Sequence, residues 1–232
     1  MPTPITHVIF DFDGLLVDTE PCYTEANKQC LAPFGKEFTM ELKAGQMGRK
    51  QTEAIPWLLE QTGLTDKITF EDYEKMYDRI LVEQFAIAPA CTGAERLVQH
   101  VTSLGIPTAI CTGSSTLDFP LKSANHRSWL DLIPLVVLTG DDLAIKRGKP
   151  HPDGFIETMK RFSSTPASPS SVLVFEDAPN GVRAALAAGM QVVQVPTSPH
   201  PAFQMEEEVR RQITVLASLL DLDPTPFGIR AF

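Results

Sequence analysis

Two aspartates stand one residue apart at the end of an apolar run near the N-terminus. Asp11 and Asp13 follow Val8–Phe10, and Gly14 comes directly after them. Because successive side chains of a strand point to opposite sides, residues two apart share a side, and the two carboxylates face one small space. Their repulsion is costly unless a cation or a proton is shared there. The spacing therefore indicates a metal site, acid–base chemistry, or both.

This stretch has two simpler interpretations. An aspartate just after a strand is often a helix cap or a turn former, and a single aspartate would favour that interpretation. A calcium-binding loop also contains Asp-x-Asp, but it needs Asp or Asn at its fifth position, Gly at its sixth and Glu at its twelfth. These positions hold Leu15, Leu16 and Cys22, so the calcium loop is excluded.

A second acidic pair follows another apolar run. Glu176 and Asp177 come directly after Val172–Phe175. Taken alone, the pair is equally well explained as a helix cap, with Asp177 or Asn180 in that role. Taken with the first pair, it supplies oxygen ligands from a separate strand end, which a hard cation such as Mg²⁺ accepts while keeping sites for water and phosphate. We therefore expect Mg²⁺ as the cofactor.

Two further segments offer groups that suit a phosphate. Thr112, Gly113 and Ser114 follow the run Thr108–Cys111, and their hydroxyls and backbone N–H groups could bind phosphate oxygens. Such a turn is more often an ordinary loop. Lys149 lies between a glycine and a proline, which restrict the local backbone and could aim one ammonium at a fixed place. Most lysines, by contrast, are solvated surface charges.

Short apolar runs place these groups at the ends of strands. The runs are Val8–Phe10, Thr108–Cys111, Val136–Leu138, Val172–Phe175 and Val192–Val195. Such composition is typical of strands buried on both faces of a parallel sheet. Helix-like patterns fill the intervals, at Gly93–Leu104, Asp153–Phe162 and Asn180–Ala188. The alternation predicts a doubly wound parallel α/β sheet, which binds ligands at the carboxyl ends of its strands.

The interval from Pro21 to Ile87 interrupts this alternation. It contains helical patterns at Pro21–Leu31, Gln51–Gln61 and Glu71–Phe85. It is far longer than a βα connection, which usually has ~2–6 residues. We predict a helical cap domain of residues 20–88, inserted into an α/β core of residues 1–19 and 89–232 and able to close over a ligand.

A basic stretch lies inside this insert. Arg49 and Lys50 belong to a glycine-flanked segment, residues 45–50, which we interpret as a turn. A solvated loop accounts for two surface cations equally well. In the functional interpretation, these residues bind the non-reacting part of the substrate.

Composition limits the remaining possibilities. The chain has 232 residues and a formal net charge of −9, which opposes binding to nucleic acid or an anionic membrane. No apolar stretch approaches the ~18 residues of a membrane helix, and the N-terminus has no pattern of a secretory signal. The four cysteines are scattered without Cys-x-x-Cys spacing. We expect a cytoplasmic monomer whose partner is a small phosphorylated metabolite.

The four motifs, in this order, resemble the haloacid dehalogenase-type phosphatase superfamily. The matching residues are Asp11–Gly14, Thr112, Lys149–Pro150 and Glu176–Asp177. The match spans nearly the whole chain, and the insert stands where that superfamily can carry a helical cap. The chain more closely resembles the pseudouridine-5′-phosphatase and glycerol-3-phosphatase subgroup, in residues 6–11, 47–50, 174–182, 184–190 and 227–228.

This resemblance implies a role for each motif. Asp11 would be the nucleophile that forms an aspartyl phosphate, and Asp13 the acid and base of the two steps. Mg²⁺ would be held by Asp11, the backbone carbonyl of Asp13 and Asp177. Glu176 would mainly stabilise these ligands without binding the ion directly. The substrate phosphate would contact residues of the other two motifs, namely Thr112, Gly113, Ser114 and Lys149.

The resemblance also frames the alternatives. It implies a phosphatase for pseudouridine 5′-phosphate or a related nucleoside or polyol phosphate, with glycerol phosphate as an alternative. A sugar phosphomutase of the β-phosphoglucomutase type stays open, because it resembles a phosphatase closely. A regulatory protein with a dead site is disfavoured, since every motif residue is present. Dehalogenase chemistry is disfavoured too, because it would leave Asp13 and Asp177 without a use.

Overall fold

The chain forms two compact units. The structure is a computed structural model that describes residues 3–46, 49, 51–197 and 205–232. One unit comprises Met1–Asp18 with Pro89–Phe232, here called the core, and the other comprises Thr19–Ala88, here called the cap. The first boundary differs by one residue from the expected division, because Thr19 groups with the cap.

A parallel sheet forms the centre of the core. Within the described residues it has six strands in the order β3-β2-β1-β4-β5-β6, and every neighbouring pair is parallel. The strands are β1 (His7–Phe10), β2 (Thr108–Thr112), β3 (Leu135–Leu138), β4 (Val172–Glu176), β5 (Gln191–Gln194) and β6 (Thr214–Val215). Strands β1, β2 and β4 are buried along their whole length, as their apolar composition predicts.

The expected fold class, a doubly wound parallel α/β sheet, is confirmed. All of the predicted strands are present, with ends shifted by a residue or so. The short edge strand β6 was not predicted. It has only two residues, Thr214 and Val215, which is too short for a recognisable pattern.

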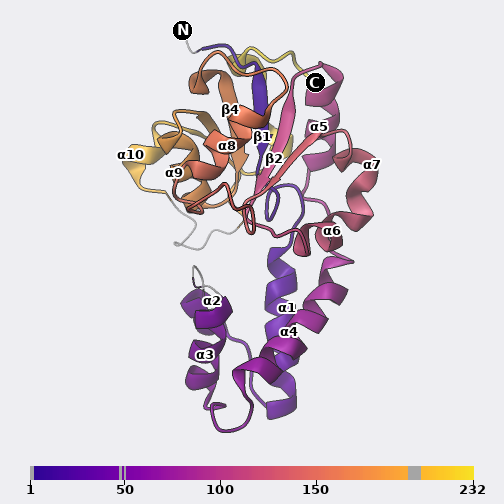
Figure 1. Cartoon of the computed structure of the whole chain (residues 1–232), viewed down its shortest axis with the longest axis vertical. Coiled ribbons are helices and arrows are strands. Elements are labelled where there is room, and N and C mark those ends of the chain that lie inside the picture. The colour runs from indigo at the N-terminus through magenta and orange to yellow at the C-terminus, as the bar shows by residue number, and fades with distance from the viewer. Residues whose placement is uncertain (1–2, 47–48, 50, 198–204) are drawn as a thin grey trace. The chain divides into compact units, whose positions relative to one another are not determined.

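Helices cover the sheet and fix the strand ends. The α-helices of the core are α5 (Ala94–Ser103), α6 (Asp118–Ser123), α7 (Arg127–Leu130), α8 (Asp153–Arg161), α9 (Pro179–Ala187) and α10 (Glu207–Arg210). Helix α8 contacts β2 and β3, while α9 contacts β4 and β5, and both lie over one face of the sheet (Figure 1). Phe155 of α8 and Val182 of α9 belong to the same buried cluster as Ile9 of β1.

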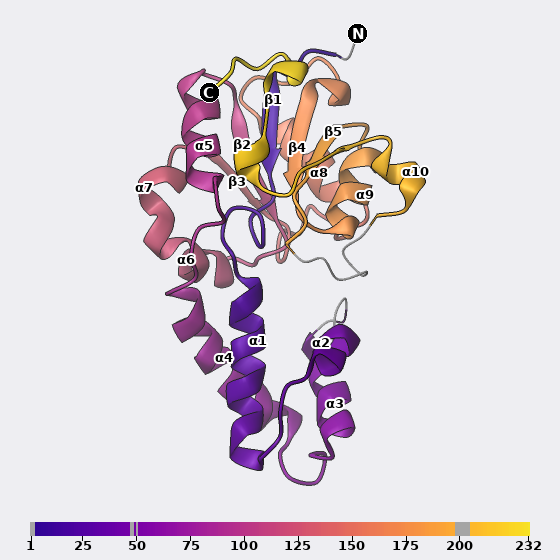
Figure 2. The same ribbon diagram turned by 180° about the vertical axis from the view of Figure 1, so that it is seen from behind.

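The cap consists of helices. They are α1 (Glu20–Leu31), α2 (Met40–Gln46), α3 (Gln51–Thr62) and α4 (Phe70–Phe85). Helices α1 and α4 run alongside each other in both views (Figures 1 and 2). Their contact includes a buried hydrogen bond, in which the Tyr73 hydroxyl donates to Asn27 Oδ1 at 3.1 Å. Short 3₁₀ segments occur in both units, at Ala32–Phe34, Ala124–His126, Pro169–Ser171, Leu219–Asp221 and Thr225–Phe227.

Helix α2 was missed in the sequence and corrects one expectation. Gly45 and Gln46 are its last residues, so the interpretation of residues 45–50 as a turn is wrong at its start. Gly45 is accommodated in the helix because the Trp57 ring occupies the space of a side chain there. Lys50 lies outside the described residues. Within the part of the chain that the structure describes, none of the helices combines the length and apolar character needed to cross a bilayer.

Candidate active site

Asp11 is the first residue after β1, and its carboxylate is buried. The Lys149 ammonium donates to Asp11 Oδ1 at 2.6 Å and to Glu176 Oε1 at 2.5 Å. Burial raises the pKa of Asp11 to about 7, although Lys149 acts in the opposite direction. Burial alone would lower the pKa of Lys149, but the two carboxylates outweigh it and hold that pKa well above its usual value. Lys149 therefore stays charged beside Asp11.

Glu176 ends strand β4 and is held from two sides. Its Oε2 accepts the backbone N–H groups of Asp177 at 3.1 Å and of Ala178 at 3.2 Å, while its Oε1 bonds Lys149. Gly181 of α9 packs directly on this carboxylate, and a Cβ there would collide with it. The glycine thus lets the helix lie close to Glu176, whose carboxylate binds the backbone N–H groups just before the first helical residue, Pro179.

Three buried carboxylates lie close together. Ligand oxygens of Asp11, Glu176 and Asp177 are all within 4.8 Å of one another. Burial, followed by repulsion from Glu176 and Asp11, raises the pKa of Asp177 well above its usual value. The Thr197 hydroxyl donates to Asp177 Oδ2 at 3.1 Å. Such a set of oxygen donors fits a hard divalent cation, which would relieve the repulsion that adds to burial in raising the pKa values of Asp11 and Asp177.

Gly14 makes room for this cluster. Its φ of +79° is a conformation that favours glycine, and a Cβ at this position would lie 2.5 Å from Asp177 Oδ2. The glycine that the sequence shows after the first acidic pair therefore does two things. It turns the chain after Asp13, and it lets the loop pass directly against the carboxylate of Asp177.

Asp13 is held by groups other than those around Asp11. Its Oδ2 accepts hydrogen bonds from Ser114 Oγ at 2.7 Å and Thr112 Oγ1 at 3.2 Å, and its Oδ1 accepts one from Lys122 Nζ at 2.7 Å. The Ser114 N–H donates to Thr112 Oγ1 at 3.0 Å. Each aspartate thus has its own ammonium. The backbone of Gly113 faces open space where a side chain would be.

The structure brings together the core residues selected in the sequence. Asp11, Glu176 and Asp177 form one cluster with Lys149, and Asp13 lies with Thr112 and Ser114. Sequence analysis missed Lys122 and Thr197. Lys122 stands in α6 without any motif around it, and Thr197 follows β5 in a loop, so only the three-dimensional structure assigns them a place.

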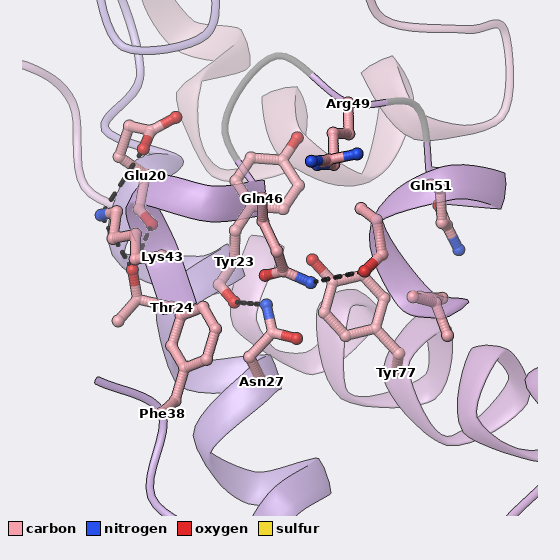
Figure 3. Close-up of a pocket in the computed structure, with 12 residues that line it drawn as sticks. Glu20, Tyr23, Thr24, Asn27, Phe38, Lys43, Gln46, Arg49, Gln51 and Tyr77 are labelled. Atoms are coloured by element: carbon pink, nitrogen blue, oxygen red, sulfur yellow. Dashed lines mark hydrogen bonds and ion pairs between the residues drawn. The ribbon is translucent and has the colours of Figure 1, made fainter. Parts of the chain in front are cut away.

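The cap has a cavity of its own. Its volume is about 320 Å³, and Figure 3 shows the side chains around it. The lining residues are Glu20, Tyr23, Thr24, Asn27, Phe38, Lys43, Gln46, Arg49, Gln51, Ala54, Ile55 and Tyr77. Arg49 is held in place there, because its Nε donates to the Gly45 carbonyl at 2.8 Å and its guanidinium lies 5.3 Å from the centre of the Trp57 ring. Among these residues, Arg49 is the one that the sequence analysis selected for substrate binding.

The parallel sheet carries two features at the ends of its strands. One is a carboxylate bonded to a lysine ammonium, and the other is a buried acidic cluster. This arrangement is typical of an α/β enzyme. Residues 5–189 match the family model of the haloacid dehalogenase-like hydrolases, and the chain belongs to this family. It is 44% identical to (DL)-glycerol-3-phosphatase 1, mitochondrial, of Arabidopsis thaliana, covering 98% of this chain and 75% of the relative. It is 38% identical to a probable pseudouridine-5′-phosphatase of Drosophila melanogaster, covering 98% and 96%.

A solved structure extends the comparison to the fold. A haloacid dehalogenase family hydrolase from Deinococcus radiodurans, with bound phosphate and sodium, superposes with a TM-score of 0.78 at 23% identity and covers 97% of each chain. The suspected family and subgroup are therefore confirmed. The family match and the phosphatase names of the relatives support the expected class, a phosphoric monoester hydrolase. The cytoplasmic location stays a prediction, since one relative is named as mitochondrial.

Proposed function

We propose that this hydrolase is a Mg²⁺-dependent phosphatase that cleaves the phosphomonoester of a small metabolite through an aspartyl phosphate on Asp11. The observation that carries the proposal is the Asp11 carboxylate itself, bonded to Lys149 at 2.6 Å and lying within 4.8 Å of the other two buried carboxylates. Lys149 fixes one oxygen of Asp11 and so orients the other for attack.

The first step transfers the phosphoryl group to the protein. An oxygen of Asp11 forms a bond to phosphorus, and the bond between phosphorus and the ester oxygen breaks. Asp13 gives a proton to that oxygen, so that the metabolite leaves as a neutral alcohol. Thr112, the Gly113 N–H, Ser114 and Lys149 hold the other phosphate oxygens in this proposal and stabilise the charge that develops on them.

The second step returns the enzyme to its starting state. A water oxygen forms a bond to the phosphorus of the aspartyl phosphate, and the bond to the Asp11 oxygen breaks. Asp13, which lost its proton in the first step, takes one from the attacking water. Inorganic phosphate leaves, Asp11 is again a carboxylate, and Asp13 is again protonated.

The acidic cluster is the proposed Mg²⁺ site. The ion would be held by Asp11, the backbone carbonyl of Asp13 and Asp177. Glu176 would mainly stabilise these ligands without binding the ion directly. Bound Mg²⁺ would cancel the repulsion between Asp11 and the anionic phosphate. Glu176 keeps the geometry in place, since it joins the Lys149 ammonium to the backbone N–H groups at the start of α9.

The proposed substrate is pseudouridine 5′-phosphate or a related nucleoside or polyol phosphate. Glycerol phosphate is the second candidate, and the higher identity to the plant glycerol-3-phosphatase favours it, at 44% against 38%. Arg49, together with Lys50, is proposed to bind the non-reacting part. We further propose that the enzyme is a cytoplasmic monomer whose partner is this metabolite and which binds neither nucleic acid nor membrane.

A phosphate-release panel with Mg²⁺ tests the proposal. It compares pseudouridine 5′-phosphate, glycerol 1- and 3-phosphate, nucleoside 5′-phosphates and sugar phosphates by kcat/KM. We expect stoichiometric inorganic phosphate and alcohol, with the highest value for one of the first two classes. Conversion of a sugar phosphate into its isomer without steady phosphate release would instead identify a phosphomutase. Absence of turnover across the panel would contradict the phosphatase assignment.

A further inference from the structure

Lys122 is a buried cation outside the motifs that define the site. Its side chain is only 4% exposed, and its ammonium donates to Asp13 Oδ1 at 2.7 Å and to Ser114 Oγ at 2.9 Å. Burying an ammonium is costly unless good hydrogen bonds compensate for the lost water. Here the compensation comes from Asp13, the proposed acid and base, and from a serine that bonds the same carboxylate.

Helix α6 is fixed to the loop that carries Asp13. At its start, Ser115 Oγ accepts the backbone N–H of Asp118 at 3.1 Å. One turn further, the ring of Phe119 packs against that of Phe12 with centroids 4.8 Å apart. Phe12 is fully buried and lies directly before Asp13. The helix therefore places Lys122 relative to Asp13 through an aromatic contact as well as through the ion pair.

The two oxygens of Asp13 have different kinds of partner. Oδ2 faces the hydroxyls of Ser114 and Thr112, and a hydroxyl can donate a hydrogen bond or accept one. Oδ1 faces the Lys122 ammonium, which can only donate. A proton on Oδ2 is therefore compatible with the hydrogen bonds on both sides, whereas a proton on Oδ1 would break the bond to Lys122.

We propose that Lys122 is a positioning residue that anchors Asp13 through Oδ1 and leaves Oδ2 to carry the transferred proton. The anchor holds in both steps, because the Oδ1 bond does not depend on whether Oδ2 carries a proton. This inference rests on the proposed function. It assigns the protein two ammonium groups with separate tasks, Lys149 for the nucleophile and Lys122 for the acid and base.

The substitution Lys122→Met tests the anchor, because it keeps a similar length and removes the donor. We compare kcat/KM for an alkyl phosphate, either pseudouridine 5′-phosphate or glycerol 3-phosphate, with that for p-nitrophenyl phosphate. The nitrophenolate leaves without a proton near neutral pH, so its release does not need Asp13 as an acid. We expect a loss of about tenfold to a hundredfold for the alkyl ester, a part of the ~10²–10⁴ that a general acid contributes. The aryl ester should lose less than about threefold, since this acid term is absent.

Two comparisons separate positioning from general damage. In an Asp13→Asn background, Lys122→Met should cause little further loss, because the group that it positions is already gone. Lys160→Met makes the same change at an exposed lysine of the core and should leave both substrates unaffected. If Lys122→Met does not fold, Lys122→Gln, which keeps a polar side chain at this position but removes the charge, should show the same preference to a smaller degree.

The outcomes distinguish the inference from the function on which it rests. Equal losses for the alkyl and aryl esters, no loss for either, or additivity with Asp13→Asn would overturn the role of Lys122 while the phosphatase stands. If the wild-type protein releases phosphate from none of the alkyl esters, the proposed function itself fails, and the inference fails with it. A selective loss for the alkyl ester that vanishes in the Asp13→Asn background supports both.

Discussion

The core site and the cap cavity are assembled in opposite ways. In the core, Asp11, Lys149 and Glu176 are far apart in the sequence, and parallel strands bring them to ionic contacts of 2.5–2.6 Å. In the cap, the cavity is lined by side chains from helices close together in the sequence, with one ion pair at 3.7 Å between Lys43 and Glu20. The core thus has a largely buried and strongly charged centre, whereas the cap cavity has a polar and aromatic lining.

This difference predicts a division of labour. A tightly connected set of charges on a sheet suits chemistry that is the same for every phosphate ester. A lining of Tyr23, Phe38, Asn27 and Arg49 offers rings, an amide and a cation, which are groups that can distinguish one organic molecule from another. Changes in the core should therefore affect all alkyl phosphates alike, with Lys122 acting only where the leaving oxygen needs a proton, and changes in the cap should depend on the organic part of the substrate.

The largest effect is expected from Asp11→Asn. The amide has nearly the same size but is a poor nucleophile, so we expect kcat to fall at least about a thousandfold, ~4 kcal/mol, for every substrate of the panel. Phosphate release by the purified variant provides the measurement. A variant that keeps more than about a tenth of the rate, a loss below ~1.4 kcal/mol, would remove Asp11 from the role of nucleophile.

The same variant allows a control on stability. The pKa of Asp11 is raised to about 7 by burial, so the metal-free folded protein holds this proton more tightly than the unfolded chain does. Asp11 therefore contributes a loss of stability as the pH rises from about 4 to about 7, and Asp11→Asn lacks this contribution. We expect the metal-free variant to melt no lower than the wild type at pH 8. A lower melting temperature would mean that the carboxylate stabilises the fold.

Removal of the metal should also lower the activity toward every substrate. Chelation by EDTA is expected to abolish phosphate release, and excess Mg²⁺ should restore it, because the acidic cluster alone repels an anionic ester. Ca²⁺ should inhibit, since it prefers more ligands at longer distances and would disturb the in-line geometry. Full activity in excess chelator would contradict the metal assignment.

A more moderate effect is expected from Gly181→Ala. The added Cβ would collide with the carboxylate of Glu176, which supports the proposed metal ligands. Loss of such support typically weakens a metal site by about 10–100-fold, so we expect the Mg²⁺ concentration for half-maximal activity to rise by a factor in that range. Ala187→Ser, an exposed change on the same helix, serves as the control. An unchanged Mg²⁺ dependence would show that Glu176 does not support the site.

The same contrast explains what the sequence could predict. The motifs of the core follow apolar strands, and parallel strands must bring their carboxyl ends to one edge, so the positions of Asp11, Thr112 and Glu176 could be predicted. Lys122 could not, because it lies on a six-residue helix whose place is set by tertiary contacts. The cap cavity could not be predicted either. The apolar spacing in α3 predicts the face that it buries, but it does not show which polar side chains of the other cap helices lie around a cavity.

The smallest effect, and the one that tests the cap, is expected from Arg49→Ala. The guanidinium is already ordered by the Gly45 carbonyl and the Trp57 ring, so it can bind a substrate without much further loss of side-chain freedom. If it binds the non-reacting part of the substrate, its removal should lower kcat/KM for the best substrate by ~1–3 kcal/mol, the usual range for a charged hydrogen bond. A small aryl phosphate should change much less, because it offers no such group.

A matched variant makes this test specific. Arg79→Ala removes an exposed arginine of the same unit that does not line the cavity, and it should leave both substrates unchanged. An equal fall in kcat/KM for both substrates in Arg49→Ala would mean that the residue stabilises the cap and does not bind the leaving group. If kcat/KM falls for neither substrate, Arg49 is a solvated surface charge, which is the alternative that its sequence context also allows. A loss confined to the best substrate, absent from other alkyl phosphates as well as from the aryl phosphate, would extend the division of labour to a named side chain, because Lys122→Met, which also spares an aryl ester, should lower the activity toward every alkyl phosphate.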